Sequence, residues 1–183
     1  WRANRKRLPA EAIRDGMLAI SGQLDLSPGA SPVAGLGVLV NNNNPDAEEY
    51  EAQSSSKRSV YLPIIRNELP ALLTVFDFAD PDLVVGKRPV TNVPAQSLLL
   101  MNSPFVMDCA DKTAKRILSS KPAINDALVD SIYQTILARA PLEAEKQRAL
   151  EFLAATTTTE EASEDQTMPS DKRVAMLVHV IFA

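Results

Sequence analysis

Cysteine and histidine are almost missing from this chain of 183 residues, which has one of each, Cys109 and His179. A single cysteine excludes an internal disulfide. It also excludes covalent attachment of a c-type haem, which needs two cysteines and a histidine. One cysteine and one histidine cannot make the usual structural zinc site of four nitrogen and sulfur ligands. We therefore expect no metal site and no bound cofactor in this part of the protein.

Aromatic residues and long apolar runs are also scarce. Aromatic side chains make up 5% of the chain, and no apolar run approaches the roughly 20 residues that span a bilayer. The 19 basic and 23 acidic side chains leave a net charge of −4, which does not attract nucleic acid. Because 45% of the residues are hydrophobic and 23% are charged, the composition predicts a globular protein without a membrane span.

The length fits one domain, so we predict a single helical domain over residues 1–183. The sequence begins at Trp1 without an initiator methionine and stops inside an apolar, helix-like run. We therefore expect a fragment of a larger protein. Residues 27–56 are rich in Pro, Gly and Asn, and residues 156–169 combine a Thr run with an acidic stretch. Both segments are predicted to be exposed loops.

Apolar spacing predicts helices at both ends of the chain. Ile13, Met17 and Ile20 form one stripe of a helix that begins near Pro9 and stops at Gly22. Over the last 80 residues the spacing predicts four helices joined by short loops. The first begins at Pro104 and ends near Ser120, and the others follow Pro122, open at Pro141 and are capped by Ser170.

Proline dominates the centre. Six prolines lie between residues 61 and 104, and each removes an amide donor, so only short helices fit there, over residues 69–76 and 93–101. Asn92 is the expected N-cap of the second of these helices. Residues 60–65 read as an extended edge segment. The fold class is therefore all-α, a bundle-like helical domain with long irregular proline-rich connections and at most a minor extended edge segment.

Several short motifs together resemble one family, the C-terminal domain of unknown function of the planctomycete cytochrome-c-domain proteins. They are RLPAEAIRD at 7–15, KRSVYLP at 57–63, FDFADP at 76–81, Arg88, TNVPAQSL at 91–98 and NSPF at 102–105. The resemblance covers nearly the whole chain in the right order. The loop around Asn41 to Asn44 departs from the family pattern as an insertion.

The resemblance implies an extracytoplasmic location, periplasmic or at the cell surface, beside a c-type haem module in the parent protein. It also implies a neighbouring domain as a partner and a polysaccharide as a possible ligand of the parent. It supplies no catalytic residues, so these stay unknown.

Polar side chains gather in the proline-rich centre, where irregular backbone often carries binding groups. The candidate ligand or partner surface consists of Asp77, Asp80, Arg88, Thr91, Asn92, Gln96 and Asn102. A purely structural interpretation competes with it. Asp77 and Asp80 would then cap helices, and Arg88 would pair with them.

Other chemistry is conceivable at single places. Asp77, Asp80 and Asp82 offer oxygen ligands for calcium, although the spacing lacks the glycine and the last glutamate of an EF-hand. A Cys109–His179 dyad requires an exposed cysteine, and noncovalent haem ligation by His179, Met101 or Met107 requires a pocket. We expect plain packing for Cys109.

Two charged regions also have a simple explanation. The basic run Arg2, Arg5, Lys6 and Arg7 is interpreted as a solvated or interdomain stretch. Glu143, Glu145, Glu151 and the acidic stretch over residues 160–165 are interpreted as exposed helix faces and loops.

Two hypotheses about function follow. The favoured one is a non-catalytic accessory or interaction domain that packs against its neighbour. The other is one part of a carbohydrate-active enzyme, with a site that the neighbouring domain completes. A pocket around Asp77, Arg88 and Asn102 favours the enzyme, and a flat apolar patch favours the interaction domain.

Overall fold

The computed structural model of the chain describes residues 7–28, 55–62, 64, 69–120, 123–154 and 170–183. These residues form seven α-helices and one 3₁₀ helix. Their only strand-like pairing is an isolated parallel bridge between Asp25 and Lys57. The all-α prediction is confirmed. The two predicted loops over 27–56 and 156–169 lie almost entirely outside the described residues.

The chain forms two compact units, each described here by itself. Unit 1 consists of residues 1–19 and 23–99, and unit 2 consists of residues 20–22 and 100–183. The expectation of a single domain stays a prediction.

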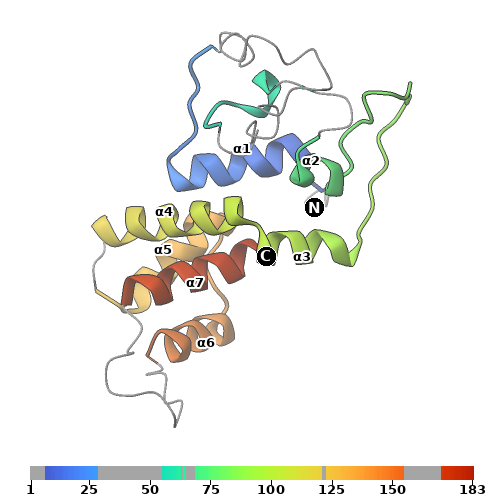
Figure 1. The fold of residues 1–183 in the computed structure, drawn as a ribbon. Coiled ribbons are helices and arrows are strands. Elements are labelled where there is room, and N and C mark those ends of the chain that lie inside the picture. The colour runs from blue at the N-terminus through green and yellow to red at the C-terminus, as the bar shows by residue number, and fades with distance from the viewer. Residues whose placement is uncertain (1–6, 29–54, 63, 65–68, 121–122, 155–169) are drawn as a thin grey trace, which may run out of the picture. The chain divides into compact units, whose positions relative to one another are not determined.

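Unit 1 contains short helices with irregular connections (Figure 1). Most of α1 (Ala10–Ser21) belongs to it, followed by the 3₁₀ helix η2 (Ser59–Tyr61), α2 (Ala71–Val75) and most of α3 (Pro94–Asn102). Its buried apolar side chains include Met17, Leu62, Leu72, Leu73 and Phe76. Proline sets the start of α2 and α3, because Pro70 precedes the first helix and Pro94 opens the second.

The buried face of α1 differs from the predicted stripe. Ala10, Arg14, Met17 and Leu18 are buried, whereas Ile13 and Ile20 are only half-buried. Periodicity missed this face because it contains an arginine, and Arg14 is 2% exposed. The helix ends where expected, since Gly22 adopts a φ of 78°, which a glycine tolerates without strain.

The extended edge predicted for residues 60–65 is wrong for Val60 and Tyr61, which are helical, whereas the Leu62 backbone is extended. Residues 59–61 form η2, in which the Tyr61 amide donates to the Arg58 carbonyl at 2.9 Å. The Ser59 amide donates to the Asp15 carboxylate at 2.8 Å. Side chains of α1 therefore take the hydrogen bonds that a neighbouring strand would have made.

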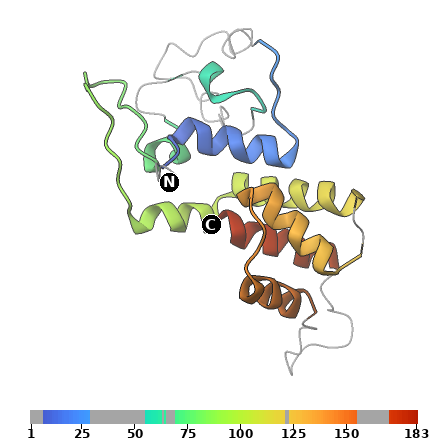
Figure 2. The same ribbon diagram turned by 180° about the vertical axis from the view of Figure 1, so that it is seen from behind.

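Unit 2 is a four-helix bundle of α4 (Pro104–Ser120), α5 (Asp126–Leu137), α6 (Glu143–Ala154) and α7 (Ser170–Phe182). Helix α4 packs mainly on α7, and α6 lies against both α5 and α7. Figure 2 shows α5 in front of α4 when the bundle is seen from behind. The core is apolar and includes Ala114, Leu128, Ile132, Leu153 and Val178.

Two helices of unit 2 begin later than the prolines suggested. Helix α5 starts at Asp126 because the Asn125 side chain accepts the Leu128 amide at 3.0 Å and caps the helix. Helix α6 starts at Glu143, two residues after Pro141, because the Glu145 carboxylate accepts the Leu142 amide at 2.8 Å. Helix α4 begins at Pro104, as predicted. Helix α7 begins at Ser170, the residue that was predicted to cap it.

The bundle core generates one prediction about stability. Ile132 is fully buried, so Ile132→Ala removes apolar contacts and leaves a cavity that lowers the free energy of unfolding by about 2–5 kcal/mol. Urea unfolding followed by circular dichroism measures the change. The control is Leu142→Ala, because Leu142 is 67% exposed and its truncation is expected to cost less than about 0.5 kcal/mol. Equal costs for both variants would contradict this assignment of the core.

Candidate functional site

The candidate site in unit 1 begins at the end of α2. Asp77 has a φ of 61°, in the left-handed region that Asp tolerates better than most residues. Its amide donates to the Thr74 carbonyl at 3.4 Å, and the Phe78 amide donates to the Leu73 carbonyl at 3.0 Å. These two bonds form a Schellman motif. The backbone of Asp77 therefore terminates α2, in line with the structural interpretation of this residue.

The Asp77 carboxylate is the centre of a polar network that we name the Asp77 network (Arg7, Asp77, Thr91 and Gln96). Asp77 accepts from the Arg7 guanidinium, from the Thr91 amide at 2.8 Å and from the Thr91 hydroxyl at 2.9 Å. Its side chain is 11% exposed. The backbone hydrogen bond from Thr91, and then the one from Arg7, lower the pKa of Asp77 below its ordinary value.

The remaining members of the network tie backbone segments together. The Gln96 amide group of α3 donates to the carbonyls of Val75 at 3.1 Å and Thr91 at 3.2 Å. Arg7 also donates to the carbonyls of Thr91 and Phe76. Three of the predicted site residues, Asp77, Thr91 and Gln96, are thus brought together, and their polar atoms bind one another.

Arg88 has a different partner from the one expected. Its guanidinium donates to the Glu11 carboxylate at 2.6 Å and lies over the Phe78 ring, 4.7 Å from the centroid. The interpretation that pairs Arg88 with Asp77 or Asp80 is therefore wrong. The reason is that Arg7 already occupies Asp77, while Glu11 on α1 offers Arg88 a carboxylate beside an aromatic face.

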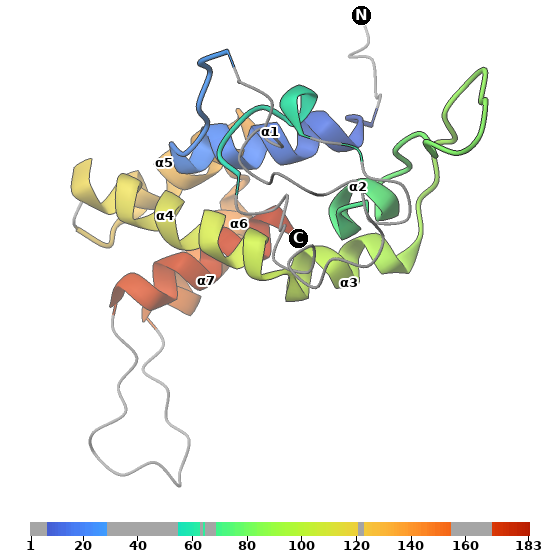
Figure 3. The same ribbon diagram turned by 45° about the horizontal axis from the view of Figure 1, so that its top comes forward.

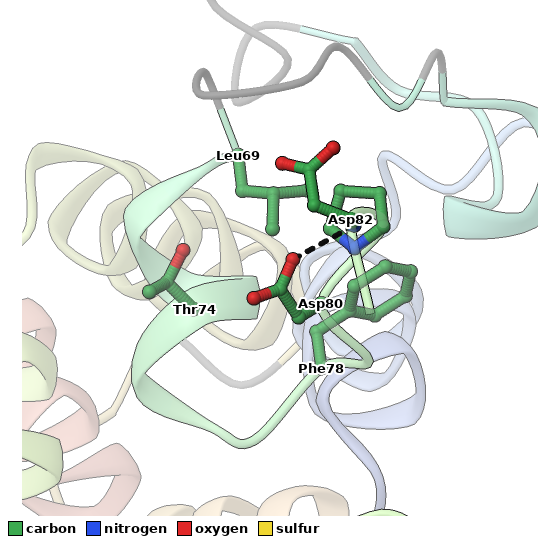
Figure 4. A pocket seen from close by; sticks show the side chains of 6 residues that line it. Leu69, Thr74, Phe78, Asp80 and Asp82 are labelled. Atoms are coloured by element: carbon green, nitrogen blue, oxygen red, sulfur yellow. Dashed lines mark hydrogen bonds between the residues drawn. The ribbon is translucent and has the colours of Figure 1, made fainter. Parts of the chain in front are cut away.

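Asp80 stabilises a turn. Its carboxylate accepts the Asp82 amide at 2.9 Å, as Figure 4 shows. Asp80 and Asp82 border a depression of about 340 Å³, together with Leu69, Thr74, Phe78 and Pro81.

Asn92 is exposed, with no hydrogen bond to another described residue, and Asn102 is exposed and belongs to unit 2. The structure does not join these two asparagines to the network.

A second group of polar side chains, on α1, was not selected by the sequence analysis. Arg14 donates to the carbonyls of Ser55 and Lys57 and to the Ser59 hydroxyl. Asp15 accepts the Ser59 amide and hydroxyl, the latter at 2.6 Å. Glu11 and Asp15, four residues apart on one helix, were the available signal.

Asp15 and Glu11 border a cleft within unit 1. Its volume is about 510 Å³. The polar lining comes from Glu11, Asp15, Arg58, Ser59 and Arg88, and the apolar lining comes from Pro9, Ala12, Val60, Leu62, Ile64 and Phe78. Of the expected residues Asp77, Arg88 and Asn102, only Arg88 borders this cleft.

The calcium alternative finds no support in the residues that are described. They contain no group of three or more His, Cys, Asp or Glu side chains arranged to hold a metal ion. Asp77 is committed to Arg7 and Thr91, and Asp80 is committed to a turn.

The dyad also lacks the geometry it needs. Cys109 is fully buried, whereas a nucleophilic thiolate must be reachable. The Nε2 atom of His179 lies 2.9 Å from the Leu100 carbonyl. Arg2, Arg5 and Lys6 of the basic run lie outside the described residues.

The Asp77 network generates a prediction about pH. Because its pKa is lowered in the folded protein, the carboxylate stabilises the fold fully above its unfolded value near 3.8. This contribution is lost as the pH falls through the folded pKa. Asp77→Asn keeps the left-handed backbone but removes the charge, and we expect it to lower the free energy of unfolding by about 1–2 kcal/mol at pH 7.

Urea unfolding between pH 2 and pH 7 measures this effect. The difference between the wild-type chain and Asp77→Asn should shrink below pH 4. The control is Asp80→Asn, because the exposed Asp80 carboxylate accepts only a local amide. A difference for Asp77→Asn that does not change with pH would contradict the electrostatic role of this residue.

Comparison with known proteins places the chain in a family. No curated protein and no solved structure matches it. The model of one family, PSD1: Protein of unknown function (DUF1553), matches residues 1–153. The match includes every residue of the Asp77 network and of the cleft on α1, and it confirms the expected membership in a family of unknown function. The chain belongs to the PSD1 family of proteins of unknown function.

Proposed function

We propose that this chain is a non-catalytic helical accessory domain that contacts a neighbouring domain of its parent protein. In this proposal the parent is a large extracytoplasmic protein of the kind that carries a c-type cytochrome module, as the motifs of the sequence suggest. Any haem belongs to another part of the parent. One observation in unit 1 carries the proposal. The polar atoms of the Asp77 network hydrogen-bond to other atoms of the protein, whereas an apolar loop next to the network is exposed to solvent.

The closed part is the Asp77 network. A site that performs chemistry on a bound substrate needs polar atoms that are free to reach it. Here both oxygens of Asp77 accept hydrogen bonds from Arg7 and Thr91. The Gln96 amide group donates to backbone carbonyls. Such saturation is typical of a structural support.

The open part is the loop that this network holds, which we name the arm (residues 79–93). Figure 3 shows it as a long excursion between α2 and α3. Leu83, Val84 and Val85 follow one another on the arm; Val84 is fully exposed and Leu83 is 64% exposed. Scattered apolar residues on a surface are ordinary, but three consecutive ones on an exposed loop favour a contact with a partner.

The anchoring of the arm supports this function. One end is fixed where Thr91 binds Asp77, and Arg88 is fixed to Glu11 on α1. The tip therefore projects from a held base, which lowers the conformational entropy that is lost when a partner binds.

A binding measurement tests the proposal. Val84→Asp places a carboxylate in the proposed contact, so we expect it to weaken binding of the neighbouring domain, added in trans, by at least about tenfold, which is 1.4 kcal/mol. Isothermal titration calorimetry measures the affinity. The control is Leu26→Asp, because Leu26 is 70% exposed and lies in unit 1 outside the arm. Unchanged affinity for Val84→Asp would overturn the proposal.

The cleft on α1 favours a second candidate function, part of a carbohydrate-active enzyme that the neighbouring domain completes. Glu11 and Asp15 border one cleft with Phe78. Residues at this spacing lie on the same face of a helix, and a glycoside hydrolase needs two carboxylates that face one cleft. Against it, Glu11 is bound by Arg88 and Asp15 is bound by Ser59.

The test of this second candidate uses the parent protein with oligosaccharides. Glu11→Gln should lower the rate of reducing-sugar release by about 100-fold or more, because it removes a carboxylate from the cleft. Asp80→Asn, a carboxylate outside this cleft, is the control. Retention of full activity by Glu11→Gln would eliminate the enzyme hypothesis at this cleft.

A further inference from the structure

A groove in unit 2 combines an apolar surface with one cation, Arg148, that makes no ion pair or hydrogen bond with another described residue. It lies where α6 and α7 meet beside α5, and we name it the α6–α7 groove. Its volume is about 270 Å³. It is lined by Tyr133, Glu145, Arg148, Ala149, Phe152, Leu177, Val180 and Ile181. All of these residues belong to the bundle of unit 2.

The walls of the groove are apolar side chains of α6 and α7, and part of their surface faces water. Ala149 and Leu177 form the buried side. Phe152 is 39% exposed and Val180 is 70% exposed. Covering this surface with an apolar ligand is favourable by about 25 cal/mol per Å² of apolar area.

The two charged residues that line the groove, Glu145 and Arg148, differ in their hydrogen bonding. Both oxygens of Glu145 accept hydrogen bonds from Arg139, at 2.7 and 2.8 Å. The side-chain hydrogen bond from Arg139 lowers the pKa of Glu145 to about 2. Glu145 is therefore an ionised carboxylate whose charge Arg139 balances.

Arg148 is the second charged residue of the groove. It is exposed, and it makes no ion pair or hydrogen bond with any other residue that the structure describes. The hydrogen bonds that lower the pKa of Glu145 come from Arg139 and Leu142, and the positive charge of Arg148 acts on the same carboxylate and helps to lower its pKa. Its five N–H donors are arranged to bind a carboxylate in a bidentate manner. Tyr133 on α5 also borders the groove, and burial raises the pKa of its hydroxyl. That hydroxyl therefore remains a donor at neutral pH.

We propose that the α6–α7 groove binds a small amphipathic monoanion, a carboxylate on an unbranched aliphatic chain. The carboxylate lies on the Arg148 guanidinium, and the chain covers Phe152 and Val180. The guanidinium of Arg148, whose donors are used by no other described residue, selects a single carboxylate. The apolar walls select a chain of methylene groups over a polar substituent.

The experiment uses octanoate as the probe, with the whole chain at pH 7 and calorimetric titration. We expect saturable binding of octanoate and at least about tenfold weaker binding of 1-octanol, which has the same tail without the charge. Octylamine should not bind, because its ammonium group is repelled by Arg148. Absence of octanoate binding, or equal binding of octanoate and octylamine, would overturn the proposal.

Variants separate the two halves of the groove. Arg148→Gln should weaken octanoate binding by about tenfold or more. The control, Lys115→Gln, removes the same charge from an exposed position on α4 and should leave the affinity unchanged. Val180→Ser should weaken octanoate and 1-octanol by a similar factor, because Val180 meets only the chain. Circular dichroism confirms that the variants are folded, and an Arg148→Gln variant that binds octanoate as tightly as the wild-type chain refutes the site.

Discussion

The carboxylate of Asp77 is the interaction on which unit 1 depends. It joins Arg7, the end of α2 and the start of the segment that leads into α3. Unit 1 has short helices and long connections, so its shape cannot be imposed by packing of long helices alone. Charge-assisted hydrogen bonds that Arg7 and Thr91 donate to one partly buried carboxylate fix the relative positions of its backbone segments. This is why the polar cluster recognised in the sequence serves as a support, although its composition is typical of a binding site.

Unit 2 is held together by burial of apolar side chains and not by a polar network. Its four helices bury a continuous apolar core, and the polar bonds at its helix ends mainly set where each helix begins. The contrast follows from proline. The prolines between residues 61 and 104 keep the helices of unit 1 short, whereas α4, α5 and α6 of unit 2 have no internal proline. Cavity-forming substitutions are therefore expected to lower stability mainly through unit 2.

The helices could be predicted from the sequence because their signals are local. Pro94, Pro104 and Gly22 each mark a boundary through the backbone of one residue. The site could be predicted only in part. Asp77, Thr91 and Gln96 lie within one short segment, so their grouping was visible, but Arg88 meets Glu11 across 77 positions of the chain. No local rule selects that carboxylate over Asp80. The buried Arg14 was missed for a related reason, since hydrophobic periodicity assigns a charged residue to the solvent side.

Charge pairing also determines what each part of the molecule is able to recognise. At Asp77, at Glu11 with Arg88 and at Glu145 with Arg139, a charge already has its counter-ion. A charged ligand would have to displace that ion, and the loss would offset most of the gain. Arg148 differs, because it makes no ion pair or hydrogen bond with another described residue, and it borders an apolar groove. Recognition of an anion there needs no existing pair to break. The most informative residue of the bundle is therefore one that contributes little to holding it together.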